Sequence, residues 1–510
     1  MPNHYYYTSY KWYNKNNIEA KKNEKFEEGN MKTRRNLSML SDFYEFTMAY
    51  GYFESGMKDT IAVFDAFYRK NPDDGGFSIF SGLDDIIDYV ENIHFDEEDI
   101  EYFRKNTRFS EEFLTYLKNF KFTGDIWAFP EGSAMFPSEP IVTVRAPIIE
   151  AQILETYLLL SLNYGSLVAT KTNRIVRAAK GRTVMEFGAR RAQGPDASVK
   201  GARSAFIAGA PITSNTLSSQ MYDYPAGGTM AHSWVQSFDS EYEAFLSYAK
   251  LYPDNCILLI DTYDVLKQGL PNAMKVFKEV LDPLGISGGV RIDSGDIAYL
   301  TKETRKILDE NGYKDAKIVA SNSLEEYKIE SLLQQGAEID SFGIGERLIT
   351  AKSDPVFGGV YKLVEIEDEK GKIAKIKVSE NVEKITTPGL KEVYRLYDKK
   401  TGKAEADYIT LKEEVVDENK PLVIFDPHFT WKMKRMENYE LRKMQVPIFK
   451  NGKKVYKSPK IEEINEYCKS EVKSLWDEVK RFDQPHNYYV DLSHDLWNLK
   501  QNLIMKAMSK

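Results

Sequence analysis

Short apolar runs alternate with helix-length amphipathic segments through the middle of the chain. The runs occupy residues 183–188, 256–264, 288–296, 317–323 and 339–345. Three segments between them, 265–281, 297–312 and 324–336, place apolar residues at i, i+3 and i+4. This spacing is typical of helices, and its alternation with buried strands predicts parallel α/β units.

The flanking regions have other patterns. From Met39 to about Phe122, helical patterns mix with short strands such as "TIAVFDAFYR". The apolar stretch 146–170 resembles a membrane span, but charged residues interrupt it, which favours a buried helix within a helical block at 147–180. Nearer the C-terminus, "DKKTGKAEADYI" predicts a hairpin and 466–482 a helix.

These patterns predict an α/β protein whose middle part consists of parallel α/β units. We expect a leader at 1–30, an N-terminal α+β domain at 31–150, the parallel α/β domain at 151–365, and a hairpin-containing C-terminal extension at 366–510 that closes against the N-terminal domain. The leader is rich in Tyr, Asn and Lys and has no apolar core of a secretory signal. We interpret it as disordered or as upstream sequence before a start at Met31.

Composition narrows the class of protein. The 510 residues carry a net charge of -8, which argues against a nucleic-acid binder. The two cysteines have no metal-like spacing, which fits the reducing cytoplasm, and the six histidines are scattered without ligand spacing. We therefore expect a cytoplasmic protein with no protein-only metal site and no membrane partner.

Polar residues follow each predicted strand of the parallel α/β domain. They are Asp261, Asp264, Arg291, Asp293, Asp296, Ser321, Asn322, Gly343 and Gly345. The carboxyl ends of parallel strands meet at one rim, which is where such folds bind ligands. The alternative is that some are helix caps, such as Asp296, or Ser323 and Glu326 as a capping box.

Four groups of residues suggest chemistry. "MEFGARRAQG" brings Glu186, Phe187, Arg190 and Arg191 together, which suits a flat anionic ring, although a surface arginine pair over a core Phe has the same pattern. "GGTMAHSW" surrounds His232 with glycines and hydroxyl groups, as a phosphate-accepting histidine requires; a lone histidine is more often a packing residue.

The other two groups suit a phosphorylated sugar. Asp261 and Asp293 are able to orient ribose hydroxyls or hold Mg²⁺, or else serve as turn residues. Backbone N–H groups of "ASNSLEE", "FGIGE" and "FGGVYK" are able to bind phosphate, as ordinary turns also are.

Seven ordered motifs resemble those of the nicotinate phosphoribosyltransferases. They are "SDFYEFTMAYGYF", "MEFGARRAQGPD", "GGTMAHSW", "LLIDTYD", "GVRIDSGD", "SNSLEE" and "IDSFGIGERLITAKSDPVFGGVYKL". The resemblance implies a type II phosphoribosyltransferase fold, which is an irregular α/β barrel with an N-terminal α+β domain and a C-terminal extension. It also implies a homodimer with shared active sites. It implies that nicotinate, phosphoribosyl pyrophosphate, ATP and water give nicotinate mononucleotide, pyrophosphate, ADP and phosphate in NAD salvage, with Mg²⁺ as cofactor.

The resemblance also implies roles for single residues. The catalytic residues are His232, which ATP phosphorylates, with Asp293 and Glu186. Substrate contacts are Tyr44 from the partner subunit, Phe187, Arg190, Ser214, Thr229, Asp261 and Arg291. Phosphate contacts are Ser321, Asn322, Gly343, Gly345, Glu346, Gly358 and Gly359.

Two positions bear on specificity. Many relatives have Thr where this chain has Glu346, so its backbone N–H, rather than its carboxylate, is the expected phosphate contact. Ser214 stands where nicotinamide-using relatives have an acid, and a hydroxyl suits a carboxylate substrate. The alternatives are a nicotinamide- or quinolinate-using transferase, or a non-catalytic phosphate-metabolite binder.

Overall fold

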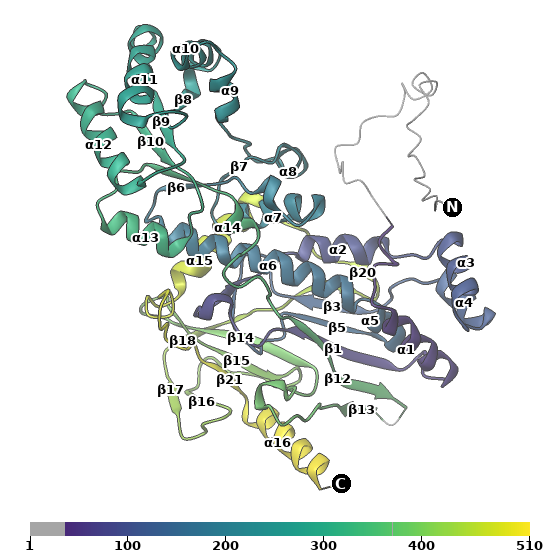
Figure 1. Cartoon of the computed structure of the whole chain (residues 1–510). Coiled ribbons are helices and arrows are strands. Elements are labelled where there is room, and N and C mark those ends of the chain that lie inside the picture. Colours follow the sequence, from purple (N-terminus) through teal and green to yellow (C-terminus); the bar gives the residue numbers. More distant parts are fainter. Residues whose placement is uncertain (1–35, 370, 510) are drawn as a thin grey trace. The chain divides into compact units, whose positions relative to one another are not determined.

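The computed structural model describes residues 36–369 and 371–509. The predicted leader at 1–30 therefore lies outside the described residues. The described part mixes helices with parallel and antiparallel sheets (Figure 1).

A six-stranded parallel sheet forms the predicted barrel, and its strands run in the order β7-β6-β11-β10-β9-β8. The strands are β6 (Thr183–Glu186), β7 (Ile212–Thr213), β8 (Ile257–Leu259), β9 (Gly289–Ile292), β10 (Lys317–Ala320) and β11 (Ser341–Ile344). Since β7 and β8 are the two edges, the barrel is incomplete. All five predicted strands are confirmed, and β7 is additional.

Helices follow the strands as the amphipathic spacing predicts. The first predicted segment is α11 (Leu270–Val276), flanked by π-helical turns, and the next two are α12 (Ile297–Glu310) and α13 (Glu326–Gln334). The remaining helices around the sheet are α7 (Pro195–Ile207), α8 (Thr216–Tyr222), α9 (His232–Gln236), α10 (Glu241–Leu251) and α14 (Glu346–Ile349).

Two predicted helix caps have different outcomes. The Asp296 side chain accepts a hydrogen bond from the Tyr299 N–H at 3.1 Å, which confirms it as the N-cap of α12. The capping box of Ser323 and Glu326 is wrong, because α13 begins at Glu326 itself. Its fully buried carboxylate instead accepts from Lys171 Nζ and Arg174 Nε, each at 2.8 Å.

Distant segments of the chain share a seven-stranded antiparallel sheet, ordered β13-β12-β1-β5-β3-β19-β20. Its strands are β1 (Ile61–Phe67), β3 (Asp125–Ala128), β5 (Val142–Pro147), β12 (Val360–Asp368), β13 (Gly371–Ala374), β19 (Val446–Lys450) and β20 (Lys453–Lys454). Segments on both sides of the expected boundaries at 150 and 365 thus belong to one sheet.

Helices pack beside this sheet (Figure 1). They are α1 (Phe43–Glu54), α2 (Leu83–Asn92), α3 (Glu97–Asn106), α4 (Glu111–Lys118), α5 (Ile148–Ile153) and α6 (Glu155–Ala178). The long α6 is mostly buried, as expected for the helical block at 147–180. Among the described residues, no helix combines the length and apolar character needed to cross a membrane.

The C-terminal region contains a four-stranded sheet ordered β18-β14-β15-β21. The hairpin prediction is confirmed by β14 (Lys391–Asp398) and β15 (Ala404–Leu411), which pair with β18 (Tyr439–Lys443) and β21 (Val490–Leu492). A two-stranded sheet in the same region pairs β16 (Leu422–Phe425) with β17 (Met433–Met436). A second two-stranded sheet, in the N-terminal part of the chain, pairs β2 (Ser78–Ile79) with β4 (Ala134–Met135).

Two helices complete this region, α15 (Ile461–Ser474) and α16 (His494–Met508). The helix predicted at 466–482 is partly wrong, because α15 begins earlier and ends at Ser474. Leu475 adopts an extended backbone and is fully buried, so its packing ends the helix where local spacing predicted continuation.

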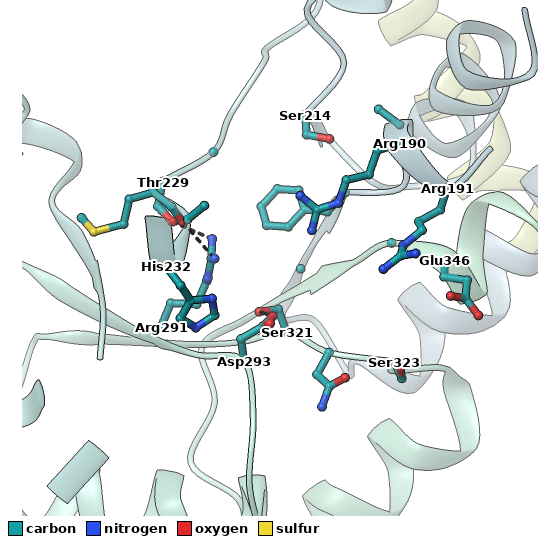
Figure 2. Close-up of a pocket in the computed structure, with 18 residues that line it drawn as sticks. Arg190, Arg191, Ser214, Thr229, His232, Arg291, Asp293, Ser321, Ser323 and Glu346 are labelled. Atoms are coloured by element: carbon teal, nitrogen blue, oxygen red, sulfur yellow. Dashed lines mark hydrogen bonds between the residues drawn. The ribbon is translucent and has the colours of Figure 1, made fainter. Parts of the chain in front are cut away.

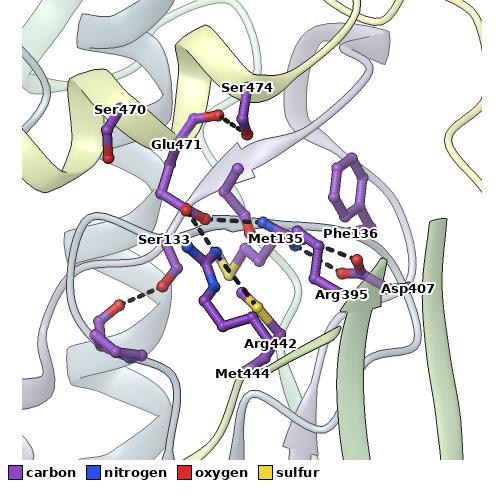
Figure 3. A network of polar contacts seen from close by, with 12 residues as sticks. Ser133, Met135, Phe136, Arg395, Asp407, Arg442, Met444, Ser470, Glu471 and Ser474 are labelled. Carbon is purple, nitrogen blue, oxygen red and sulfur yellow. Dashed lines mark hydrogen bonds and ion pairs between the residues drawn. The ribbon is translucent and has the colours of Figure 1, made fainter. Parts of the chain in front are cut away.

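A buried arginine joins β14, β15 and α15 (Figure 3). Arg395 is fully buried and donates to both carboxylate oxygens of Asp407, at 2.8 and 2.6 Å. It also donates to Glu471 at 2.8 Å, and Arg442 binds the other Glu471 oxygen at 2.5 Å. Buried charges of this kind are stable when every partner is present.

We predict that Arg395→Met lowers the free energy of unfolding by about 3–5 kcal/mol, because it leaves buried carboxylates without their counterion. Chemical denaturation measures the effect. The control is Arg435→Met, since Arg435 pairs with Glu437 at 2.8 Å with both side chains more than 60% exposed. It should cost less than about 1 kcal/mol, and equal losses in the two variants would contradict the prediction.

Candidate active site

A cavity of about 420 Å³ lies at the carboxyl rim of the parallel sheet (Figure 2). Loops that follow β6, β7, β9, β10 and β11, together with the segment before α9, surround it. It is lined by Phe187, Ala189, Arg190, Arg191, Ser214, Gly228, Thr229, Met230, Ala231, His232, Arg291, Asp293, Ser321, Asn322, Ser323, Gly343, Gly345 and Glu346. Six of the nine rim residues predicted from the sequence therefore line one cavity, whereas Asp261, Asp264 and Asp296 do not.

Phe187 is held over the neighbouring strand β11. Its backbone N–H donates to the Ile344 carbonyl at 2.8 Å, which continues the pairing of β6 with β11. A Cβ atom on Gly343 would lie 2.5 Å from the Phe187 ring, and one on Gly345 would lie 2.9 Å from the Phe187 carbonyl oxygen. Both glycines therefore allow Phe187 to lie against the sheet at the cavity wall.

The turn after Phe187 directs two arginines toward the cavity (Figure 2). Arg190 and Arg191 are both exposed, and they lie in the short 3-10 turn Ala189–Arg191. Ser214 reaches the same wall from β7, because its N–H donates to the Glu186 carbonyl at 2.8 Å. An aromatic ring, two guanidinium groups and a hydroxyl thus surround one end of the cavity.

His232 is the first residue of α9 and faces Asp261 at the end of β8. Its Nε2 lies 3.2 Å from Asp261 Oδ1. The His232 side chain is 39% exposed, whereas that of Asp261 is 1% exposed. A buried carboxylate thus orients an accessible imidazole.

The other oxygen of Asp261 binds the segment after β9. It accepts from the Asp293 N–H at 3.0 Å and from the Ser294 hydroxyl at 2.6 Å. The carboxylate of Asp293 in turn accepts a short hydrogen bond from Ser321. Asp261, predicted as a ribose contact, does not line the cavity and instead connects His232 to the Asp293 segment.

Arg291 holds the segment that precedes His232. It donates from Nη1 to the Thr229 hydroxyl at 2.7 Å and from Nη2 to the Met230 carbonyl at 3.0 Å. Burial lowers the pKa of Arg291 from its usual value. Its buried Nε has no hydrogen-bond partner among the described residues.

Besides Asp261, four predicted site residues lie outside this cavity, namely Glu186, Tyr44, Gly358 and Gly359. Glu186 is fully buried, accepts from the Thr213 hydroxyl at 2.6 Å and from the Gly188 N–H, and its pKa is raised by burial. Through these contacts Glu186 positions the turn that follows Phe187. Tyr44 is 44% exposed on α1, and the Gly359 N–H donates to Asn163 at 2.9 Å.

Several lining residues carried little sequence signal of their own. Ala189, Gly228, Met230 and Ala231 are small or apolar, and they line the cavity mainly because their neighbours do. Ser323 was considered as a cap, although it belongs to the loop after β10. In the part of the chain that the structure describes, no group of three or more His, Cys, Asp or Glu residues could hold a metal ion.

Comparisons with known proteins agree over most of the chain. Residues 39–163, 183–392 and 390–500 match the N-terminal domain, the family domain and the C-terminal domain of nicotinate phosphoribosyltransferases. A nicotinate phosphoribosyltransferase of Bacillus subtilis (strain 168) is 42% identical over 474 residues, which are 93% of this chain and 96% of the relative. The human one is 30% identical over 91% of this chain and 96% of its own.

Solved structures have the same fold. The crystal structure of human nicotinic acid phosphoribosyltransferase aligns with a TM-score of 0.79 and 27% identity, over 91% of this chain and 100% of that one. A nicotinate-nucleotide pyrophosphorylase from Pyrococcus furiosus aligns with a TM-score of 0.67 over 88% of this chain and 99% of its own, and at 23% identity it supports the fold alone.

The incomplete barrel and its similarity to the human structure identify a phosphoribosyltransferase enzyme with the type II fold. Identity to relatives over nearly the full length narrows this class. The chain belongs to the nicotinate phosphoribosyltransferase family.

The contact between Gly343 and Phe187 generates a prediction about stability. Gly343→Ala should lower the free energy of unfolding by about 1–3 kcal/mol, because the added methyl group overlaps the ring. Gly228→Ala is the matched control, since an added Cβ there meets nothing within 4 Å. Its change should stay within about 0.5 kcal/mol in the same denaturation experiment, and a larger loss than in Gly343→Ala would refute the steric explanation.

Proposed function

We propose that the protein joins nicotinate to the ribose carbon of phosphoribosyl pyrophosphate, coupled to ATP hydrolysis, in NAD salvage. The products are nicotinate mononucleotide, pyrophosphate, ADP and phosphate. The observation that carries the proposal is the common cavity, in which an aromatic ring and arginines face Asp293 and His232. A volume of about 420 Å³ is within the range for small-molecule sites.

The nicotinate end is the wall formed by Phe187, Arg190 and Ser214. The pyridine ring stacks on Phe187, and the nicotinate carboxylate accepts from Arg190 and Arg291. Thr229, which is bound to Arg291, completes this contact. A wall of cationic and hydroxyl donors favours a carboxylate over the amide of nicotinamide.

The phosphoribosyl end is the wall formed by the loops after β9, β10 and β11. Asp293 orients the ribose hydroxyls, while the N–H groups and side chains of Ser321, Asn322, Gly343 and Gly345 bind phosphate. The pyridine lone pair forms the new bond to the anomeric carbon as the carbon–oxygen bond breaks. The bonding electrons leave with pyrophosphate, so no proton has to be removed.

Mg²⁺ fits this wall as a cation that phosphate oxygens share with protein carboxylates. Asp293 and Glu346 are the carboxylates that line the cavity, and Mg²⁺ commonly combines one or two carboxylates with substrate phosphates. When bound, it neutralises charge on the leaving pyrophosphate.

ATP coupling is assigned to His232. When Nε2–H donates to Asp261, Nδ1 keeps its lone pair and attacks the terminal phosphorus of ATP, and ADP leaves. The phosphorylated enzyme binds the substrates more tightly, and hydrolysis of the phosphohistidine after turnover releases the product. The coupling is thus a difference in affinity between two enzyme states.

We predict that His232→Ala abolishes ATP consumption tied to turnover and leaves a slow, ATP-independent formation of nicotinate mononucleotide with weaker substrate binding. Incubation with γ-labelled ATP should label the parent in an acid-labile, base-stable form and leave the variant unlabelled. Loss of ATP-independent transfer in a folded variant, or acid-labile label on it, would place His232 in another role. Absence of any nicotinate mononucleotide from the parent would refute the function itself.

The proposed homodimer shares its active sites through Tyr44. This residue is 44% exposed on α1, and the same helix exposes the apolar side chains of Phe43 and Met48. Tyr44 does not line the cavity of its own chain, which supports a contribution to the cavity of a partner subunit.

We predict that inactive Tyr44→Ala and inactive Arg291→Ala proteins regain activity when their subunits exchange. Random pairing would restore about one quarter of parental activity, since half of the dimers contain one intact site of two. Product formation after mixing is the measurement, and exchange is checked with a tagged subunit. No recovery despite confirmed exchange would assign Tyr44 to its own subunit.

A cytoplasmic location is also part of the proposal. Cys256 and Cys468 are buried and have no disulfide partner, which fits a reducing compartment.

A further inference from the structure

One of the two carboxylates that line the cavity, Glu346, lies in the phosphate wall near Arg191. Glu346 follows Gly345 and lines the same side of the cavity as Arg191 (Figure 2). Lys352 binds the Glu346 carboxylate at 2.5 Å and is the main cause of its lowered pKa, with further contributions from Arg191 and Arg347. Glu346 is therefore ionised near neutral pH.

The pair of Glu346 and Lys352 is open to solvent. The Glu346 side chain is 36% exposed and that of Lys352 is 51% exposed, so water and ions compete with the contact. Lys352 does not line the cavity, whereas Glu346 does. A ligand that enters the cavity thus meets the carboxylate in front of the lysine.

The charge of this carboxylate acts differently on two forms of a pyrophosphate group. Metal-free pyrophosphate carries several negative charges, which Glu346 repels. The magnesium complex of pyrophosphate carries less negative charge. Its Mg²⁺ ion binds a carboxylate oxygen directly or through water. The same side chain therefore disfavours one form and tolerates or binds the other.

We propose that Glu346 makes the phosphate wall selective for magnesium-complexed over metal-free pyrophosphate groups. The inference rests on the proposed function, because it takes the phosphate wall to hold the pyrophosphate of phosphoribosyl pyrophosphate. It assigns to the Glu346 side chain a role separate from the backbone N–H contact expected at this position.

Titration calorimetry of the full chain with inorganic pyrophosphate tests the proposal. Selectivity is the Kd measured with a chelator divided by the Kd measured with excess Mg²⁺. We expect Glu346→Gln to bind metal-free pyrophosphate more tightly and to lower this selectivity at least about fivefold, because it removes a like charge a few ångströms from the ligand. Unchanged selectivity in this variant would overturn the proposal.

Glu325→Gln is the matched control, since Glu325 forms an ion pair with Arg347 at 3.3 Å and does not line the cavity. It should keep the parental selectivity, and an equal loss there would reduce the effect of Glu346 to general charge and overturn the proposal. Lys352→Met should raise the selectivity, because it leaves the carboxylate without its cation. If the selectivity instead falls in Lys352→Met, the role of Glu346 is to neutralise Lys352, which also contradicts the proposal.

The same preparations separate this inference from the proposed function. Nicotinate mononucleotide formation by the parent tests the transferase reaction, and melting temperatures show whether each variant is folded. A parent that forms product while Glu346→Gln keeps its selectivity contradicts the role of Glu346 alone. A parent that forms no product and binds no pyrophosphate contradicts both.

Discussion

The parallel pairing of β6 with β11 is the interaction on which the candidate site depends. Residues 183–186 and 341–344 are far apart in the chain, yet their register joins Thr183 to Ser341 and Glu186 to Ile344. Parallel strands end on the same side of a sheet, so this pairing brings Phe187 and its arginines beside Gly343 and Gly345 at the end of β11. Residues 183–191 could not otherwise share a cavity with the later strand ends.

A second constraint is the burial of charge in positions where every group has a partner. Arg395 with Asp407 and Glu471, and Glu326 with Lys171 and Arg174, are placed at joints between elements rather than in the cavity. Inside the cavity Arg190 and Arg191 are exposed instead. The protein thus places its compensated charges in the scaffold and keeps accessible charges where a ligand can bind them.

Sequence reasoning predicted the strands and the rim because both depend on local patterns. Apolar runs that end in Asp, Arg, Ser or Gly identify β8 to β11 and their functional ends. The two-residue β7 has too short a pattern to detect, and the pairing of β19 with β3 is non-local, so the shared seven-stranded sheet could not be read from spacing. Sequence reasoning placed Asp261 at the rim. The pattern of a carboxylate after a strand is the same whether the side chain contacts a sugar or a histidine. The contact with His232 needed three-dimensional distances.

Asp261 also connects His232, the proposed site of phosphorylation, with Asp293, the proposed ribose contact. One of its oxygens faces His232, the other binds the Asp293 backbone, and Asp293 is held by Ser321. In the proposed mechanism, phosphorylation of His232 places new negative charge beside the Asp261 carboxylate. A displacement of Asp261 changes its hydrogen bond with the Asp293 N–H. In the proposed mechanism, His232 and the Asp293 segment are therefore coupled through the single side chain of Asp261.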